Sequence, residues 1–121
     1  MYLLTAYTVL LAFLSLNSKI VLDSSPAIGI VSWDMLDHAA AYGVLAVLLM
    51  VTFKRHQQQW ATSLSVLLMC GLMGILFEYC QLWFTTTRQF SYYDAGANVF
   101  GAVLGVSIFW CYWTIALMRA R

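Results

Sequence analysis

Residues 78–105 read EYCQLWFTTTRQFSYYDAGANVFGAVLG, and this stretch decides the fold. Apolar runs long enough to cross a bilayer lie on both sides of its polar turn at 85–93. These runs nevertheless carry a Glu, a Gln, an Asp and an Asn, which are rare in membrane-spanning segments unless they face protein or water. The stretch therefore predicts two membrane-crossing helices that bring polar groups into a protein interior.

The composition extends this interpretation to the whole chain. Of the 121 residues, 63% are hydrophobic and 9% are charged, whereas a soluble domain has about 25% charged residues. Such a chain cannot cover a water-facing surface, and its length allows one domain of about four spans. The net charge of +1 provides no basic patch, so nucleic acid is not an expected partner.

We expect an all-α membrane protein, a single-domain bundle of four transmembrane helices. A polar segment, KRHQQQ at 54–59, separates the middle two spans, and residues 17–33 include a connecting loop. The predicted spans are residues 2–22, 34–53, 60–84 and 94–118.

The placement of lysine and arginine predicts the orientation. Four of these residues lie on one side of the predicted membrane, in the middle loop and after the last span, and two lie on the other side. Cytoplasmic loops carry an excess of Lys and Arg. Both termini are therefore expected in the cytoplasm.

Three predicted spans bring polar residues to one depth, because the second and fourth enter from the outer face and the third ends there. One turn of four residues descends about 6 Å, so residues near these helix ends form a layer in the outer leaflet. We expect this layer to line a polar pocket open to the outer surface. Its members are Asp34, His38, Tyr42, Glu78, Gln81, Arg88 (in the turn), Asp94 and Asn98.

Glycines occupy the same helix faces below the polar residues. Gly71 and Gly74 are in line with Glu78 in the third span, and Gly101 and Gly105 follow Asn98 in the fourth. Small residues let membrane helices approach closely. These four glycines are predicted to serve helix packing.

Several polar residues also have a purely structural interpretation. Asp34 and Asp94 can be anions that favour helix N-termini, and Glu78 can be a carboxyl group that holds the bundle together. Arg88 has a planar fork that suits either a carboxylate partner or a lipid phosphate. Its role is left open between the two.

No metal site or cofactor is expected from the sequence. His38 and His56 fall on opposite sides of the predicted membrane, and a lone histidine is more often hydrogen-bonded within the structure than bound to a metal. The three cysteines have no metal-site spacing and all fall in apolar runs.

The pattern resembles the VanZ-like family of small bacterial membrane proteins. The first shared signature is Asp34, His38 and Tyr42 at intervals of four, in a helix that runs inward. The second is Glu-x-x-Gln at 78–81, then an Arg, an Asp, an Asn and Gly-x-x-x-Gly at 101–105. The likeness covers about residues 32–105. Met35 stands where the family usually has a lysine, so a phosphate-pairing cation is not expected there.

This resemblance implies a multi-pass protein of the bacterial cytoplasmic (inner) membrane. The family is named for a protein linked to low-level resistance to the glycopeptide teicoplanin. The favoured hypothesis is binding of an anionic or polar envelope lipid or cell-wall precursor, with an effect on glycopeptide susceptibility. One alternative is an enzyme that acts on such a lipid, with Glu78 or His38 as general base and Arg88 as electrostatic clamp. The other is a structural subunit of a homo-oligomer or larger membrane complex.

Overall fold

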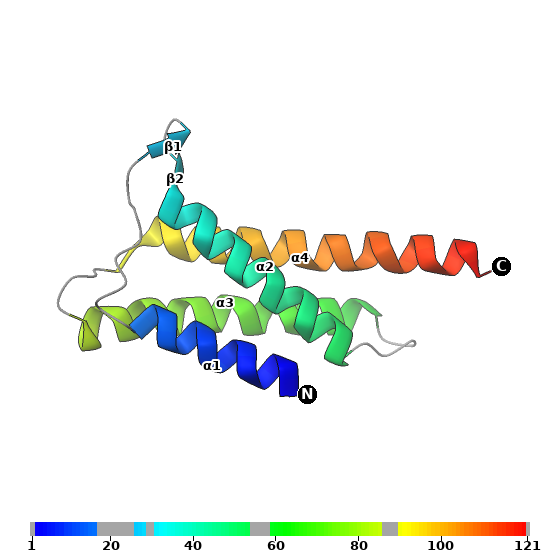
Figure 1. Ribbon diagram of the computed structural model, residues 1–121, viewed down its shortest axis with the longest axis horizontal. Helices are drawn as coiled ribbons and strands as arrows, with labels where there is room; N and C mark the ends of the chain where they lie inside the picture. The colour runs from blue at the N-terminus through cyan, green and yellow to red at the C-terminus, as the bar shows by residue number, and fades with distance from the viewer. Residues whose placement is uncertain (1, 17–25, 29–30, 54–58, 86–89, 121) are drawn as a thin grey trace.

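The computed structural model describes residues 2–16, 26–28, 31–53, 59–85 and 90–120. Successive helices run in alternating directions, so α2 and α4 begin at the end of the molecule where α3 finishes (Figure 1). The elements in chain order are α1 (Tyr2–Leu16), β1 (Pro26–Ile28), β2 (Val31–Ser32), α2 (Trp33–Phe53), α3 (Gln59–Phe84) and α4 (Tyr92–Arg119).

Three of these helices are long and apolar enough to cross a membrane. Their apolar segments have 21, 25 and 28 residues, and each contains an 18-residue window with a mean hydropathy of 1.7, 1.9 and 1.8, respectively. At 1.5 Å per residue they are about 32, 38 and 42 Å long, and a bilayer core is about 30 Å thick. The predicted spans at 34–53, 60–84 and 94–118 agree with α2, α3 and α4 within two residues at each end.

The first helix is shorter than the predicted first span. α1 is apolar but has 15 residues, and residues 17–22 of the predicted span lie outside the described residues. The prediction of four helices is confirmed, while a crossing by α1 and the orientation of the termini stay predictions. Between α1 and α2, where we expected only a loop, Pro26 pairs with Ser32 and Ile28 with Val31 in a short antiparallel hairpin.

The same capping contact starts both α2 and α4. Ser32 Oγ accepts a hydrogen bond from the Met35 N–H at 3.2 Å, and Ser91 Oγ accepts one from the Asp94 N–H at 3.2 Å. A serine before a helix satisfies an N–H group that has no partner within the helix. Each cap is followed by an aspartate in the first turn, where the helix dipole favours an anion.

Glycines bring the backbones of α2 and α4 into contact. A Cβ atom added at Gly101 would collide with the carbonyl group of Ala39, and one added at Gly105 would collide with the carbonyl group of Gly43. Gly43 contributes from the other side, since its Cβ would lie 3.2 Å from the carbonyl oxygen of Gly101. The sequence analysis did not single out Gly43, although it forms part of this close seam.

The other two predicted packing glycines differ from each other. A Cβ added at Gly74 would lie 3.0 Å from Asn98 Nδ2, so α3 approaches α4 closely at that level. A Cβ at Gly71 would touch only the Val99 side chain, at 4.0 Å, which is an ordinary contact.

The buried apolar core lies along the seam and away from the end where α2 and α4 begin. α1 packs against it and is held by a hydrogen bond of 2.9 Å from the Tyr7 hydroxyl to the Ala41 carbonyl. The outward faces of the long helices are apolar, as a bilayer solvent requires; Leu72 is 69% exposed and Ile108 is 62% exposed. The buried core residues are Leu11, Tyr42, Leu45, Ala46, Leu49, Met50, Val66, Cys70, Ala102, Val106 and Phe109.

Candidate functional site

Polar side chains from α2, α3 and α4 gather at the end of the bundle where α2 and α4 begin. Three of them are almost fully buried, with Glu78 1%, Gln81 2% and Asn98 1% exposed. Burying polar groups inside a membrane bundle is costly unless they find partners, so their contacts are informative. We define the polar cluster as Asp34, His38, Tyr42, Glu78, Gln81, Asp94 and Asn98.

His38 connects α2 to α4 inside this cluster. Its Nδ1 atom lies 3.1 Å from Asn98 Oδ1. Because an amide oxygen only accepts hydrogen bonds, Nδ1 carries the proton and donates. Its Nε2 atom lies 3.7 Å from Asp34 Oδ1, one turn earlier on α2. The imidazole ring therefore lies between the Asn98 amide, near Nδ1, and the Asp34 carboxylate, near Nε2.

Glu78 connects α3 to α4 through Ser91. The Ser91 N–H donates to Glu78 Oε2 at 3.1 Å, while the Ser91 side chain caps α4 by accepting from the Asp94 N–H. One residue therefore fixes both the buried carboxylate and the start of α4. The sequence analysis missed Ser91, although a serine three residues before an acidic residue at a helix start is a known capping signal.

Among the residues that the structure describes, the buried cluster atoms without a hydrogen-bond partner include His38 Nε2, the Tyr42 hydroxyl and Gln81 Nε2. The last two can donate hydrogen bonds. The Gln81 backbone is anchored, because its carbonyl accepts from the Thr85 N–H at 3.0 Å and from Thr85 Oγ1 at 2.8 Å. Buried groups of this kind call for an explanation, and a bound ligand is one.

Aromatic rings pack at the junction of α3 and α4 beside the cluster. The ring centroids of Tyr79 and Phe90 are 5.0 Å apart, those of Phe90 and Tyr92 are 4.9 Å apart, and those of Tyr79 and Trp83 are 5.9 Å apart. Pairs at these separations stabilise the positions of their helices. They hold the end of α3 against the start of α4, which supports the contact between Glu78 and Ser91.

An apolar groove of about 430 Å³ runs between α2 and α4, next to the cluster. Its first α2 residue, Ala39, directly follows His38. The sequence analysis expected a polar pocket, but none of the seven cluster residues lines this groove. The groove residues are Ala39, Ala40, Gly43, Val44, Val47 and Leu48 of α2 with Gly101, Leu104, Gly105 and Ile108 of α4.

One remaining predicted site residue, Arg88, lies outside the described residues. The other seven all lie on α2, α3 or α4 near the same end. Tyr42 lies deepest on α2 and is 3% exposed. How these residues act on a ligand stays a prediction.

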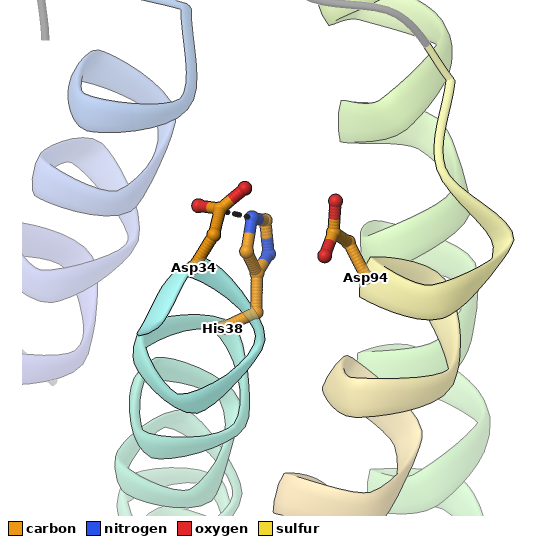
Figure 2. Close-up of side chains that lie close together, drawn as sticks. All are labelled: Asp34, His38 and Asp94. Atoms are coloured by element: carbon orange, nitrogen blue, oxygen red, sulfur yellow. Dashed lines mark ion pairs between the residues drawn. The ribbon is translucent and has the colours of Figure 1, made fainter. Parts of the chain in front are cut away.

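Three members of the cluster also have the geometry of a metal site. One ligand atom each from Asp34, His38 and Asp94 lies within 4.8 Å of the others. Figure 2 shows the Asp34 and His38 side chains on the first turns of α2, with the Asp94 carboxylate facing them from α4. The sequence analysis expected no metal site because it searched for two histidines, and it did not consider two aspartates from different helices beside one histidine.

Three apolar helices of membrane-crossing length indicate a membrane protein, and a buried polar cluster lies at one end of them. The model of the VanZ/LLP1 family matches residues 2–116, which is nearly the whole chain. The protein therefore belongs to this family, as the sequence signatures predicted. Searches of curated proteins and of solved structures found no match.

Proposed function

We propose that this protein binds an amphiphile of the bacterial envelope, a polar or anionic lipid or a lipid-linked cell-wall precursor. The polar headgroup would lie at the polar cluster and an acyl or prenyl chain would lie in the apolar groove. The observation that carries the proposal is the direct junction of these two features, since His38 belongs to the cluster and Ala39 lines the groove.

The groove suits a hydrocarbon chain. Its lining is built from Ala, Gly, Val, Leu and Ile, and its volume of about 430 Å³ is within the usual range for ligand sites, about 300–1,000 Å³. Val44 and Ile108, at its edges, are 47% and 62% exposed, so a chain can enter sideways from the bilayer. Such a chain would lie between α2 and α4.

The cluster suits a headgroup with both donors and acceptors. Asp34 and Asp94 offer carboxylate oxygens to hydroxyl or ammonium groups, while the Tyr42 hydroxyl and Gln81 Nε2 offer donors to phosphate or sugar oxygens. Arg88, in the adjoining turn of the sequence, is the matching residue for an anionic group. The proposed orientation places this end in the outer leaflet of the cytoplasmic membrane.

Lipid occupancy measured by native mass spectrometry in nanodiscs tests the proposal. Val44→Trp fills the groove and should reduce retained lipid about tenfold or more, a loss of about 1.4 kcal/mol. The matched control is Ile75→Trp on α3, because Ile75 has a similar exposure of 46%, against 47% for Val44, and does not line the groove. Equal retention in wild type and Val44→Trp would refute the proposal.

A second arm tests the headgroup. Arg88→Ala should weaken retention of anionic lipids selectively, and Arg119→Ala, at the other end of α4, is the control for loss of a positive charge. If the bound lipid is a cell-wall precursor, the same variants should alter glycopeptide susceptibility in cells. The mass of the recovered lipid is also measured by mass spectrometry. A difference from the mass of the lipid supplied would favour the enzyme hypothesis over binding alone.

A further inference from the structure

We infer that Asp34, His38 and Asp94 form a binding site for one divalent transition-metal cation, with Zn²⁺ and Mn²⁺ as the fitting ions. The site joins the first turns of α2 to the first turn of α4. It shares Asp34 and Asp94 with the proposed headgroup site, but metal binding needs only the chain's own side chains and can be measured separately from lipid retention.

The separations of the three ligand groups fit a shared ion. They lie within 4.8 Å of one another, and His38 Nε2 is 3.7 Å from Asp34 Oδ1. Two ligands bound at about 2.1 Å with angles of 90–120° lie about 3.0–3.6 Å apart. Small rotations of the two aspartate side chains, which face the imidazole in Figure 2, close the remaining difference.

The state of His38 provides the second, independent observation. Its side chain is 10% exposed, and within the described part of the chain its buried Nε2 atom has no hydrogen-bond partner. The distance of 3.7 Å to Asp34 Oδ1 is too long for a hydrogen bond. In the tautomer with its proton on Nδ1, the Nε2 atom has the lone pair that a metal ion would bind, and Nε2 lies on the side of the ring near the two aspartates.

Asn98 holds the imidazole as a metal ligand requires. Histidines that bind metals almost always donate their other ring N–H to a carbonyl or carboxylate, which fixes the tautomer and the ring orientation. The bond from His38 Nδ1 to Asn98 Oδ1 at 3.1 Å does this. Asn98 is itself confined, since it is 1% exposed and packs against Gly74.

The helix N-termini alone do not explain the arrangement. A helix dipole accounts for Asp34 and Asp94 separately, but not for their convergence on a buried imidazole nitrogen. A cation between them compensates both carboxylates. One nitrogen and two oxygen ligands select a transition metal over Ca²⁺ or Mg²⁺, and coordination positions remain open for water or an oxygen of a bound group.

Isothermal titration calorimetry with the 121-residue chain tests the inference. The protein is freed of any polyhistidine tag, treated with EDTA, placed in nanodiscs and titrated separately with Zn²⁺, Mn²⁺ and Mg²⁺. Wild type should bind one equivalent of Zn²⁺ or Mn²⁺ more tightly than Mg²⁺. Asp34→Asn, His38→Ala and Asp94→Asn should each weaken this binding about 10–100-fold or more.

Two variants are matched controls for residue type. Asp37→Asn removes an exposed carboxylate from the same part of α2, and His56→Ala removes the chain's other histidine; both should bind like wild type. Asn98→Ala should weaken binding about 10–100-fold through the orientation of His38, and Asn98→Asp should restore it. Circular dichroism checks that each variant is folded. If His38→Ala unfolds, the test rests on Asp34→Asn and Asp94→Asn, in which the new side chain has nearly the same size and shape.

Two outcomes would overturn the site. One is the absence of saturable binding of Zn²⁺ and Mn²⁺ by folded wild type. The other is binding that survives Asp34→Asn and Asp94→Asn together but is lost in His56→Ala. Loss of metal binding in the Asp34→Asn and Asp94→Asn variants, with lipid retention unchanged, would support the metal site. The lipid proposal is tested separately by Val44→Trp.

Discussion

The two ends of this helical bundle are held together in different ways. At the end where α4 finishes, the rings of Phe109 and Trp113 stack with centroids 6.1 Å apart, and the Trp110 indole N–H donates to Ser63 Oγ at 2.9 Å. At the other end, Glu78 and Asn98 are buried in a network that links three helices. Since apolar packing and a hydrogen bond between neutral groups contribute to the first end, assembly alone does not require a buried carboxylate and amide at the second.

The largest effect is expected where the seam between α2 and α4 meets the polar end. Gly101→Leu places a side chain against the Ala39 carbonyl, and because this neighbour is backbone, it should destabilise the bundle by about 3 kcal/mol or more. Unfolding in SDS, followed by circular dichroism, measures the change. Gly96→Leu on the same helix is the control, because nothing lies within 4 Å of a Cβ at Gly96. Equal stability of the two variants would contradict the close seam.

Removal of the buried carboxylate should have the next largest effect. Glu78→Ala leaves the Ser91 N–H without its acceptor and should reduce the free energy of unfolding by about 2 kcal/mol. Glu78→Gln keeps an acceptor oxygen of similar size and should lose less than half of that. If both variants were equally unstable, the negative charge rather than the hydrogen bond would hold α3 to α4.

A smaller loss is expected at the link between α2 and α4. Asn98→Ala removes the acceptor of His38 Nδ1 and should lower the free energy of unfolding by about 1–2 kcal/mol. Asn98→Asp retains an acceptor oxygen and tests whether the loss comes from this bond. The imidazole nitrogen resonances of His38 in NMR should move in Asn98→Ala, whereas a packing defect alone would leave them unchanged.

The smallest effect is expected at the opposite end. Ser63→Ala removes the acceptor of the Trp110 N–H, and hydrogen bonds between membrane helices average about 0.6 kcal/mol. The same unfolding titration compares it with Asn98→Ala. A cost for Ser63→Ala as large as that for Asn98→Ala would remove the contrast between the two ends.

The three long helices, and the position of the described polar residues near one end of them, could be predicted from sequence for simple reasons. Apolar runs bounded by polar turns define α2, α3 and α4, and a fixed rise per residue in helices of alternating direction brings Glu78 and Asn98 to similar depth. The helical repeat also predicts which residues share one face of each helix. Length, rise per residue and face can all be read from the sequence of a single helix.

Features that depend on how two helices meet could not be predicted. The apolar groove results from the separation of α2 and α4, which Gly43 sets together with the predicted glycines Gly101 and Gly105. The approach of Asp94 to His38 depends on the rotation of each helix about its own axis. The paired strands β1 and β2 are too short to have a recognisable periodicity. Ser91 was overlooked because the polar residues considered were those with charged and amide side chains.

The direction of α4 makes the sidedness of the polar cluster simple to determine in living cells. This helix starts at Tyr92, at the end that holds the polar cluster, and is about 42 Å long at 1.5 Å per residue. A helix of this length that crosses a bilayer core of about 30 Å ends on the opposite face. A fluorescent or enzymatic reporter fused beyond Arg119 would therefore report the compartment that the cluster does not face. One fusion protein would decide which side of the membrane the proposed lipid and metal sites face.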